Sequence, residues 1–321
     1  MSILNAGIIP LPAHAVQENI VQDTESVTRV IQTLTEQRHI KAKEVIASVP
    51  GPAVIVKRTT FPRQGPRELE ETILFEAGNF IPESLDDVNL DYQVLNTNPD
   101  TDNVDVLLVA VRKDVINSYV TAITKANLVP VVVDVDYFAL ENMFEVNYTL
   151  NPEEVVALIN IGARYASINI LKGRQSIFTS DVPVGGQRLT NALAQELGLS
   201  FGEAEIAKIK RENEGEAQAE EVEKIIAATT ADLLDELQHA LSFFWTGPVE
   251  EQISAVYVSG GMVQLPGLAS AMSERLQIPV EISNPFRQIN ISHQADGPFI
   301  RQNASALAVS VGLATRRPGD Q

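Results

Sequence analysis

The fold is decided by the stretch VYVSGGMVQLPGL at residues 256–268. It predicts a buried strand, a diglycine turn at Gly260 and Gly261, and a following helix. A strand that runs through glycines into a helix places backbone N–H groups against the ribose and phosphates of a nucleotide. The same pattern also occurs as a plain packing device, so this stretch alone leaves both interpretations open.

A second glycine turn lies earlier in the chain, in NIGARYAS at residues 160–167. We expect it to join a buried strand at 155–161 to a second strand at 166–171. Gly162 and Ala163 let the backbone approach an anionic group, and exposed N–H groups can hold phosphate. The alternative is that Gly162 only permits a tight β-turn.

Helices separate the two turns. Helical segments are expected at 188–197 and 202–210, and a long amphipathic helix carries apolar residues at helical spacing from Val222 to Phe244. The acidic tract Glu212–Glu223 is expected to be a solvated loop. No repeat of 20–50 residues is found in the chain.

The first half of the chain contains an inserted module. Strands are expected at 3–9, 44–49 and 53–58, with a helix near Val27–Leu34. From Arg63 the order becomes helix, two strands, helix and strand, ending near residue 133. This order predicts a compact α+β subdomain at 63–133.

Composition excludes several functions. The 321 residues carry a formal net charge of −18, 45% are hydrophobic, and none is cysteine. The negative charge argues against nucleic-acid binding, and the absence of cysteine excludes disulfides and thiolate chemistry. No apolar run reaches the roughly 20 residues that span a bilayer. We therefore expect a globular cytoplasmic protein without a signal peptide or membrane insertion.

The two glycine turns, in this order around a helical insertion, resemble the second half of the nucleotide-binding fold shared by actin, sugar kinases and Hsp70. The early α+β insertion resembles that of the cell-division protein FtsA. This resemblance implies an α/β, actin-like (FtsA/PilM-type) fold of two lobes with an inserted subdomain in the first lobe. The expected subdomains are 1A at 1–62, 1C at 63–133, 1A again at 134–153, 2A at 154–187, 2B at 188–253, and 2A with a return to 1A at 254–321.

The whole chain resembles the PilM family of type IV pilus assembly proteins. Matching segments include PLPAHAV (10–16), DVLLVAVRKDVINSYV (105–120), PVVVDVDYFALENMFEVNY (130–148), VPVGGQRLTNAL (182–193), SFGEAEIAKIK (200–210) and NPFRQI (284–289). The resemblance implies an ATP site with Mg²⁺. Its cofactor-binding residues would be Asn160, Gly162, Ala163, Ser167, Glu205, Lys208, Gly260 and Gly261. Without the resemblance, Glu205 and Lys208 also fit an exposed pair on a helix.

Two departures from the family pattern weaken the expected nucleotide chemistry. The family's glycine- and serine-rich phosphate-1 loop, of the form GLDIGSSS, does not occur in residues 1–20. The chain is thus expected to start after this loop and to be less stable than a version extended by about 25 residues. Asn160 stands where many relatives carry an acidic residue, and an amide cannot act as a general base. We expect ATP binding without efficient hydrolysis, and no catalytic or metal-ligating residue is assigned.

The resemblance implies a cytoplasmic scaffold for pilus assembly and twitching motility. Such a scaffold binds the N-terminal cytoplasmic peptide of the inner-membrane protein PilN in a groove between the first subdomain and the insertion. It thereby links PilN, PilO and PilP to the cytoplasmic motor ATPases, and it is peripheral at the inner membrane through its partner. Candidate groove residues are Phe75, Phe80, Ile81 and Pro82, although Phe75 and Phe80 also fit a core role.

Two other functions remain open. A filament former similar to FtsA would self-associate with nucleotide and carry a C-terminal amphipathic membrane helix. The ending RRPGDQ (316–321) is too short and too proline-broken for such a helix. A small-molecule kinase of the same fold would need a catalytic acid and an intact phosphate-1 loop, and neither is found in this sequence.

Overall fold

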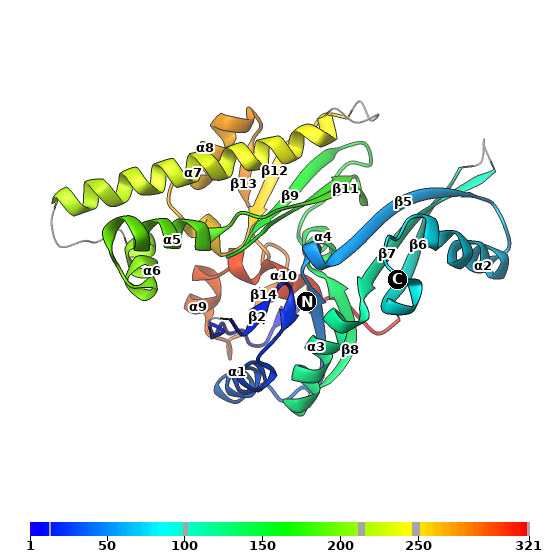
Figure 1. The fold of residues 1–321 in the computed structure, drawn as a ribbon, viewed down its shortest axis with the longest axis horizontal. Helices are drawn as coiled ribbons and strands as arrows, with labels where there is room; N and C mark the ends of the chain where they lie inside the picture. The colour runs from blue at the N-terminus through cyan, green and yellow to red at the C-terminus, as the bar shows by residue number, and fades with distance from the viewer. Residues whose placement is uncertain (13, 99–101, 211–215, 246–250, 320–321) are drawn as a thin grey trace. The chain divides into compact units, whose positions relative to one another are not determined.

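The computed structural model describes residues 1–12, 14–98, 102–210, 216–245 and 251–319. The chain divides into two compact units (Figure 1). Unit 1 comprises Met1–Leu4 and Tyr137–Gly312, and unit 2 comprises Asn5–Asp136 and Leu313–Gln321. Over the described ranges, no helix is both long enough and apolar enough to cross a bilayer.

Unit 1 is built on a five-stranded sheet in the order β11-β10-β9-β12-β13. The antiparallel meander consists of β9 (Val155–Ile161), β10 (Ala166–Lys172) and β11 (Gln175–Val182). On its other side β9 pairs in parallel with β12 (Ala255–Ser259), which pairs in parallel with β13 (Val280–Ile282). The central strand β9 is buried almost throughout, as its continuous apolar run predicts for a strand covered on both faces.

Helices cover both faces of this sheet. One face packs against α5 (Gly186–Leu197), α7 (Glu216–Trp245) and α8 (Leu268–Leu276), with Ile159, Leu193 and Leu237 in a single core. Figure 1 shows α7 running along the sheet, with α5 and α6 (Phe201–Lys210) at one end. On the opposite face lies α4 (Asp136–Asn147), whose Phe144 ring centroid is 4.7 Å from that of Tyr257. The remaining elements of this part are η4 (Gly261–Gln264), β14 (Asn290–Ile291), α9 (Gly297–Gln302), η5 (Ser305–Leu307) and α10 (Ala308–Leu313).

The predicted strand at 3–9 is wrong beyond residue 3. Only β1 (Ser2–Ile3) pairs, in parallel with β14. At Asn5 the side-chain oxygen accepts a hydrogen bond from the Ala6 N–H, and its amide donates to the Arg38 carbonyl. Only the bond to Ala6 is local, since Arg38 lies 33 residues further along the chain. The side chain of Asn5 thus engages backbone groups directly after the point where the β1 ladder ends.

Unit 2 contains a parallel strand pair, β4 (Glu44–Val49) and β8 (Val129–Val135). Helix α1 (Thr24–Gln37) is capped by Asp23, whose carboxylate accepts from the Ser26 N–H, and it packs against α3 (Lys113–Lys125) through Val27 and Ala122. Short strands β2 (Val16–Gln17) and β3 (Ile20–Val21) form a small antiparallel pair. A single turn, η1 (Gly51–Ala53), follows β4.

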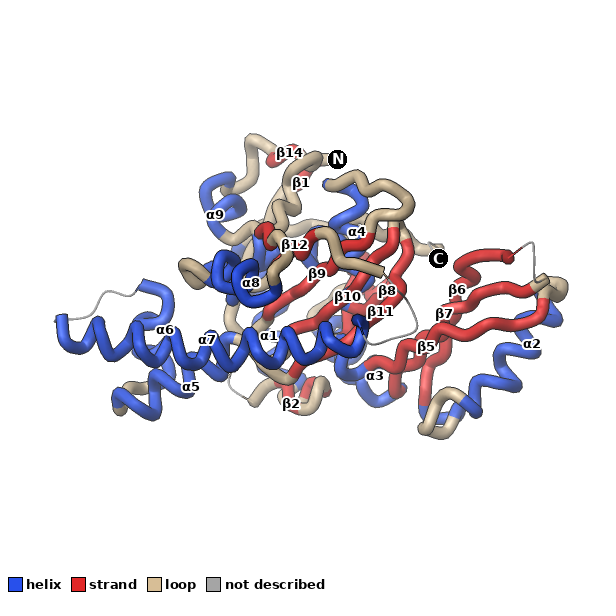
Figure 2. Tube along the Cα trace, turned by 90° about the horizontal axis from the view of Figure 1, so that it is seen from above, coloured by secondary structure: helices blue, strands red, loops and turns tan. Residues whose placement is uncertain are grey.

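The inserted module of unit 2 is an antiparallel sheet in the order β5-β7-β6, covered on one face by α2 (Figure 2). Its elements are β5 (Val54–Pro62), α2 (Pro66–Glu76), η2 (Ala77–Asn79), η3 (Leu85–Asp87), β6 (Val88–Asn98) and β7 (Asn103–Arg112). Leu69 and Ile73 of α2 pack on Phe61, Val106 and Leu108 of the sheet. Pro66 occupies the first turn of α2, where its missing N–H has no helical partner to lose.

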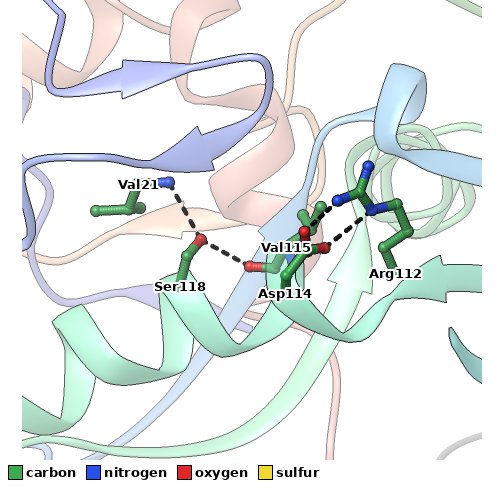
Figure 3. Close-up of polar contacts among 5 residues, drawn as sticks. All are labelled: Val21, Arg112, Asp114, Val115 and Ser118. Atoms are coloured by element: carbon green, nitrogen blue, oxygen red, sulfur yellow. Dashed lines mark hydrogen bonds and ion pairs between the residues drawn. The ribbon is translucent and has the colours of Figure 1, made fainter. Parts of the chain in front are cut away.

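The insertion joins α3 through a fixed polar junction (Figure 3). Arg112, the last residue of β7, pairs with Asp114 in the first turn of α3, with an Nε to Oδ1 distance of 3.0 Å. The hydrogen bond from Arg112 lowers the pKa of Asp114. One turn further on, the Ser118 hydroxyl accepts from the Val21 N–H at 3.1 Å and donates to the Val115 carbonyl at 2.7 Å.

The C-terminal segment of unit 2 is held by a buried ion pair. Arg316 Nε lies 2.9 Å from Asp134 Oδ2 at the end of β8, and the Asp134 side chain is only 5% exposed. Burial raises the pKa of Asp134, although the positive charge of Arg316 acts in the opposite direction. The side chain of the neighbouring Asp136 accepts from the Gly51 N–H at 3.0 Å.

The acidic tract differs from its expected loop conformation. Helix α7 begins at Glu216, so the second part of the tract is helical, whereas 211–215 lie outside the described residues. Glutamate and alanine favour helix, and Val222 already belongs to the buried stripe of α7. The tract therefore extends the amphipathic helix by roughly two turns.

Candidate functional site

The two predicted glycine turns leave neighbouring strands of unit 1 at the same edge of the sheet. Asn160 on β9 pairs in register with Ser259 on β12, and each strand then enters its glycine turn. The Ser259 hydroxyl lies 3.4 Å from the Asn160 side-chain oxygen. The carboxyl ends of adjacent parallel strands are where α/β folds bind ligands.

Gly260 is required by its backbone conformation and by its surroundings. Its φ is +96°, and a Cβ at this position would stand 2.3 Å from the Ile161 carbonyl oxygen. Its N–H donates to the Ser305 carbonyl at 2.9 Å. Gly261 begins η4, and a Cβ there would meet nothing within 4 Å. The diglycine thus combines one obligatory glycine with one position that is open to a ligand.

The turn at 162–165 supports the start of α5. Its Gly162 N–H donates to the Tyr165 carbonyl at 2.9 Å. The Gly162 carbonyl accepts from the Gly186 N–H at 3.0 Å, and the Ala163 carbonyl accepts from the Gln187 N–H at 2.8 Å. A Cβ on Gly185 would lie 2.6 Å from both carbonyl oxygens. The first N–H groups of α5 are therefore used in fixing the turn.

A row of polar residues crosses the sheet beside the turns. The register places Asp181, Ser167, Asn160 and Ser259 opposite one another on β11, β10, β9 and β12. Residues directly opposite on neighbouring strands share one face of the sheet. Ser167 and Ser259 are buried, at 3% and 0% exposure. The row supplies hydroxyl, amide and carboxylate oxygens at the edge where the glycine turns begin.

Lys208 and Glu205 point toward the same region rather than lying on a free helix face. Lys208 Nζ is 2.6 Å from Glu205 Oε1, 2.9 Å from Thr190 Oγ1 and 3.4 Å from the Gly186 carbonyl. The Lys208 side chain is 14% exposed. Met262 Sδ also approaches Gly186, at 3.3 Å from the position of a Cβ. The cation is thus held between α6 and α5, and Met262 of η4 approaches the same start of α5.

The structure brings most of the predicted nucleotide residues together. Asn160, Gly162, Ala163, Ser167, Gly260 and Gly261 lie on the paired turns and strands, and Glu205 and Lys208 meet the start of α5. Sequence reasoning missed Asp181, Gly185, Gly186 and Thr190. A signal for the glycines was present in VPVGGQRLTNAL, where a diglycine separates a strand from a helix. Asp181 required the strand register, which the sequence does not give.

No group of three or more His, Cys, Asp or Glu side chains that could hold a metal occurs among the described residues. The polar row contributes a single carboxylate, from Asp181, together with neutral oxygens. Such a set suits a hydrated cation that is mainly bound by phosphate oxygens, because Mg²⁺ keeps several waters.

The four predicted partner residues occupy different environments in unit 2. Phe75 on α2 is 82% exposed, Pro82 is exposed, Phe80 is half-buried against the core under α2, and Ile81 is 3% exposed. Ile81 belongs to a core cluster with Ala77, Val88 and Ala110. Of the four, Phe75 presents the largest accessible apolar surface.

Two solved structures share the fold of this chain. The ethanolamine utilization protein EutJ from Carboxydothermus hydrogenoformans is 13% identical, with a TM-score of 0.53 over 94% of this chain and 78% of that chain. MreB5 of Spiroplasma citri bound to AMPPNP is 11% identical, with a TM-score of 0.51 over 93% of this chain and 76% of that chain. At these identities the likeness establishes the fold alone, and it confirms the predicted actin-like fold.

The family follows from a match over nearly the whole chain. Residues 2–318 match the family described as type IV pilus assembly protein PilM. The chain belongs to this family. A solved structure described as a PilM-PilN type IV pilus biogenesis complex is 25% identical, with a TM-score of 0.86 over 97% of this chain and 90% of that chain.

Proposed function

We propose that this protein is the actin-like adaptor of a type IV pilus machine and that it binds the N-terminal cytoplasmic peptide of PilN. The observation that carries the proposal is the similarity to the PilM-PilN complex, which extends over 97% of this chain. The match of residues 2–318 to the family supports it independently.

The inserted module of unit 2 is the proposed binding region for the peptide. Phe75, Phe80 and Pro82 at the exit of α2 supply apolar surface, and Ile81 supports them from the core. A short extended peptide is anchored by only a few of its apolar side chains and buries little surface. It therefore gains affinity mainly when the binding site is rigid before the peptide binds. The antiparallel sheet beneath α2 provides this rigidity.

We also propose that the glycine turns of unit 1 hold ATP. The Gly162-Ala163 and Gly260-Gly261 backbones approach the phosphates, and Lys208 with Glu205 contacts the nucleoside side of the ligand. Lys208 is already oriented by Thr190 and the Gly186 carbonyl, so little side-chain entropy would be lost on binding. MreB5, which shares the fold, was solved bound to AMPPNP, and this supports nucleotide binding by the fold.

Mg²⁺ fits the polar row only as a hydrated ion. Bound with ATP, it would neutralise phosphate charge. Asn160 and Ser167 would hydrogen-bond its waters, and Asp181 would supply the one carboxylate of the row. Because Asn160 cannot take a proton from an attacking water, we propose that nucleotide is bound and not efficiently hydrolysed.

The adaptor role places the protein at the cytoplasmic side of the inner membrane through PilN. PilO and PilP would be linked indirectly, and the motor ATPases of the pilus would be contacted on the cytoplasmic side. Twitching motility would be the process served. An FtsA-like filament former and a small-molecule kinase are alternatives that no observation in this structure favours.

Co-purification from membranes tests the proposal. Tagged protein should retain full-length PilN from detergent-solubilised membranes and should not retain PilN that lacks its cytoplasmic N-terminal segment. Equal retention of both PilN forms, or of neither, would contradict the proposed interaction.

A further inference from the structure

We propose that the exposed face of α2 recognises a cationic, amphipathic stretch of the partner's cytoplasmic segment. We call this surface the α2 face and define it by Glu70, Glu71, Leu74, Phe75 and Gly78. The inference rests on the proposed function, and it adds the chemistry that the partner must present at this site.

The apolar part of the α2 face is not needed for the core. Leu74 and Phe75 are 50% and 82% exposed, whereas Leu69 and Ile73, on the other side of the same helix, are 7% and 0% exposed. Leu69 and Ile73 already cover the sheet of the inserted module. A phenylalanine exposed to this degree, with an exposed leucine next to it in the helix, leaves apolar surface in water that a partner could cover.

Gly78 lies in η2, directly after α2, and we call this open position without a side chain the notch. It follows Leu74 by four residues and Phe75 by three, so it lies on the same side of the helical segment. A Cβ on Gly78 would meet nothing within 4 Å, and its backbone is not in the left-handed region. Neither packing nor backbone conformation therefore requires glycine here. The notch leaves space for a partner side chain to lie against the backbone beside Phe75.

The charges around this apolar surface indicate the sign of the charge that the partner must carry. Glu70 and Glu71 are exposed one turn before Leu74 and Phe75. Neither carboxylate forms an ion pair within the described ranges. Lysine or arginine beside an apolar anchor would complement both features of the surface.

Two other occupants fit the α2 face less well. The surface of an anionic membrane would be repelled by Glu70 and Glu71, although it would accept Phe75. A second copy of this chain carries a net charge of −18, so its approach is also opposed by long-range repulsion. The cationic, amphipathic segment is the occupant that the charge and the apolar surface favour together.

The test is a fluorescence-anisotropy titration of a labelled PilN N-terminal peptide into the full chain. Gly78→Leu fills the notch, and a Glu70→Gln/Glu71→Gln double variant removes the charge at nearly constant volume. Gly202→Leu is the matched control for the notch, because Gly202 on α6 also has nothing within 4 Å of a Cβ. A Glu220→Gln/Glu221→Gln variant on α7 is the matched control for the charge, since both residues are exposed.

Gly78→Leu is expected to raise the Kd about tenfold, and the double Gln variant about threefold to tenfold. The double variant should also reduce the salt dependence of binding, because it removes the screened attraction. Both control variants should bind as the wild type does. If the wild type binds while both α2 variants keep its Kd and salt dependence, the inference is wrong and the proposed function stands. If the folded wild type does not bind the peptide at all, both fail.

Discussion

Gly260 lies so close to Ile161 that a Cβ on Gly260 would stand 2.3 Å from the Ile161 carbonyl oxygen. This contact joins the diglycine turn to the end of β9 and fixes the position of both glycine turns. The positive φ of Gly260, +96°, adds a conformational cost for any L side chain.

Gly260→Ala should therefore distort the site for two reasons. The new Cβ collides with the Ile161 carbonyl oxygen, and alanine is strained at a positive φ. We expect the free energy of unfolding to fall by roughly 1–3 kcal/mol from strain alone, with a further loss from the collision. Binding of a fluorescent ATP analogue should be lost. Gly202→Ala on α6 is the matched control, because that position is also open, has no positive φ and lies outside the glycine turns. Thermal unfolding and analogue fluorescence measure the two effects, and equal behaviour of both variants would contradict the assignment.

Lys208 should matter for nucleotide binding more than for stability. Lys208→Met removes the cation from Thr190 and the Gly186 carbonyl while it keeps most of the side-chain volume. We expect the Kd for the ATP analogue to rise about tenfold or more, since a charge-assisted contact is lost. Lys224→Met is the control, because the pair of Lys224 with Glu220 on α7 is largely exposed. An unchanged Kd in Lys208→Met would show that the cation is only structural.

Removing Arg316 should destabilise the protein in a pH-dependent manner. Burial raises the pKa of Asp134 in the folded protein above its value in the unfolded chain. The preferential protonation of the folded state adds to the free energy of unfolding. This contribution is fully present below the unfolded-state pKa and is lost as the pH rises through the folded-state pKa. Arg316→Met leaves the buried carboxylate unpaired and raises this pKa further. The variant should lose about 3–5 kcal/mol at neutral pH, and less at lower pH where Asp134 is protonated.

Thermal unfolding from about pH 4, near the ordinary pKa of an aspartate, up to about pH 8 checks the Arg316 prediction. The double variant Asp134→Leu/Arg316→Met is the control, because it removes both charges and should recover much of the lost stability. The midpoint difference between wild type and Arg316→Met should widen as the pH rises. A difference that is constant over this range would argue against titration of Asp134.

The sheet of unit 1 could be predicted from the sequence because its strands carry continuous apolar runs. The strand expected at 155–161 matches β9, and the strand expected at 166–171 ends one residue before β10 does. The predicted subdomain limits remain predictions. The expected strand at 3–9 ends at residue 3, and just beyond it the side chain of Asn5 hydrogen-bonds the Ala6 N–H and the Arg38 carbonyl.

The candidate site was predictable only where glycine marks a turn. Gly162 and Gly260 stand out in the sequence, whereas Asp181 joins the site through the register of β10 and β11. The environment of Lys208 depends on the packing of α5 on α6, which brings Thr190 next to it. Exposure also could not be read from residue type: Phe75 and Ile81 are both apolar, yet one is 82% exposed and the other 3%.

The central claim is that this chain is a PilN-binding adaptor, and the most direct measurement is the affinity of the isolated interaction. A labelled PilN N-terminal peptide is titrated into the folded chain with and without Mg-ATP, next to a scrambled peptide of equal composition. The account predicts saturable binding with a Kd of about micromolar or lower for the native peptide, and much weaker binding of the scrambled one. Equal binding of both peptides, or no binding of the native peptide in either condition, would contradict it.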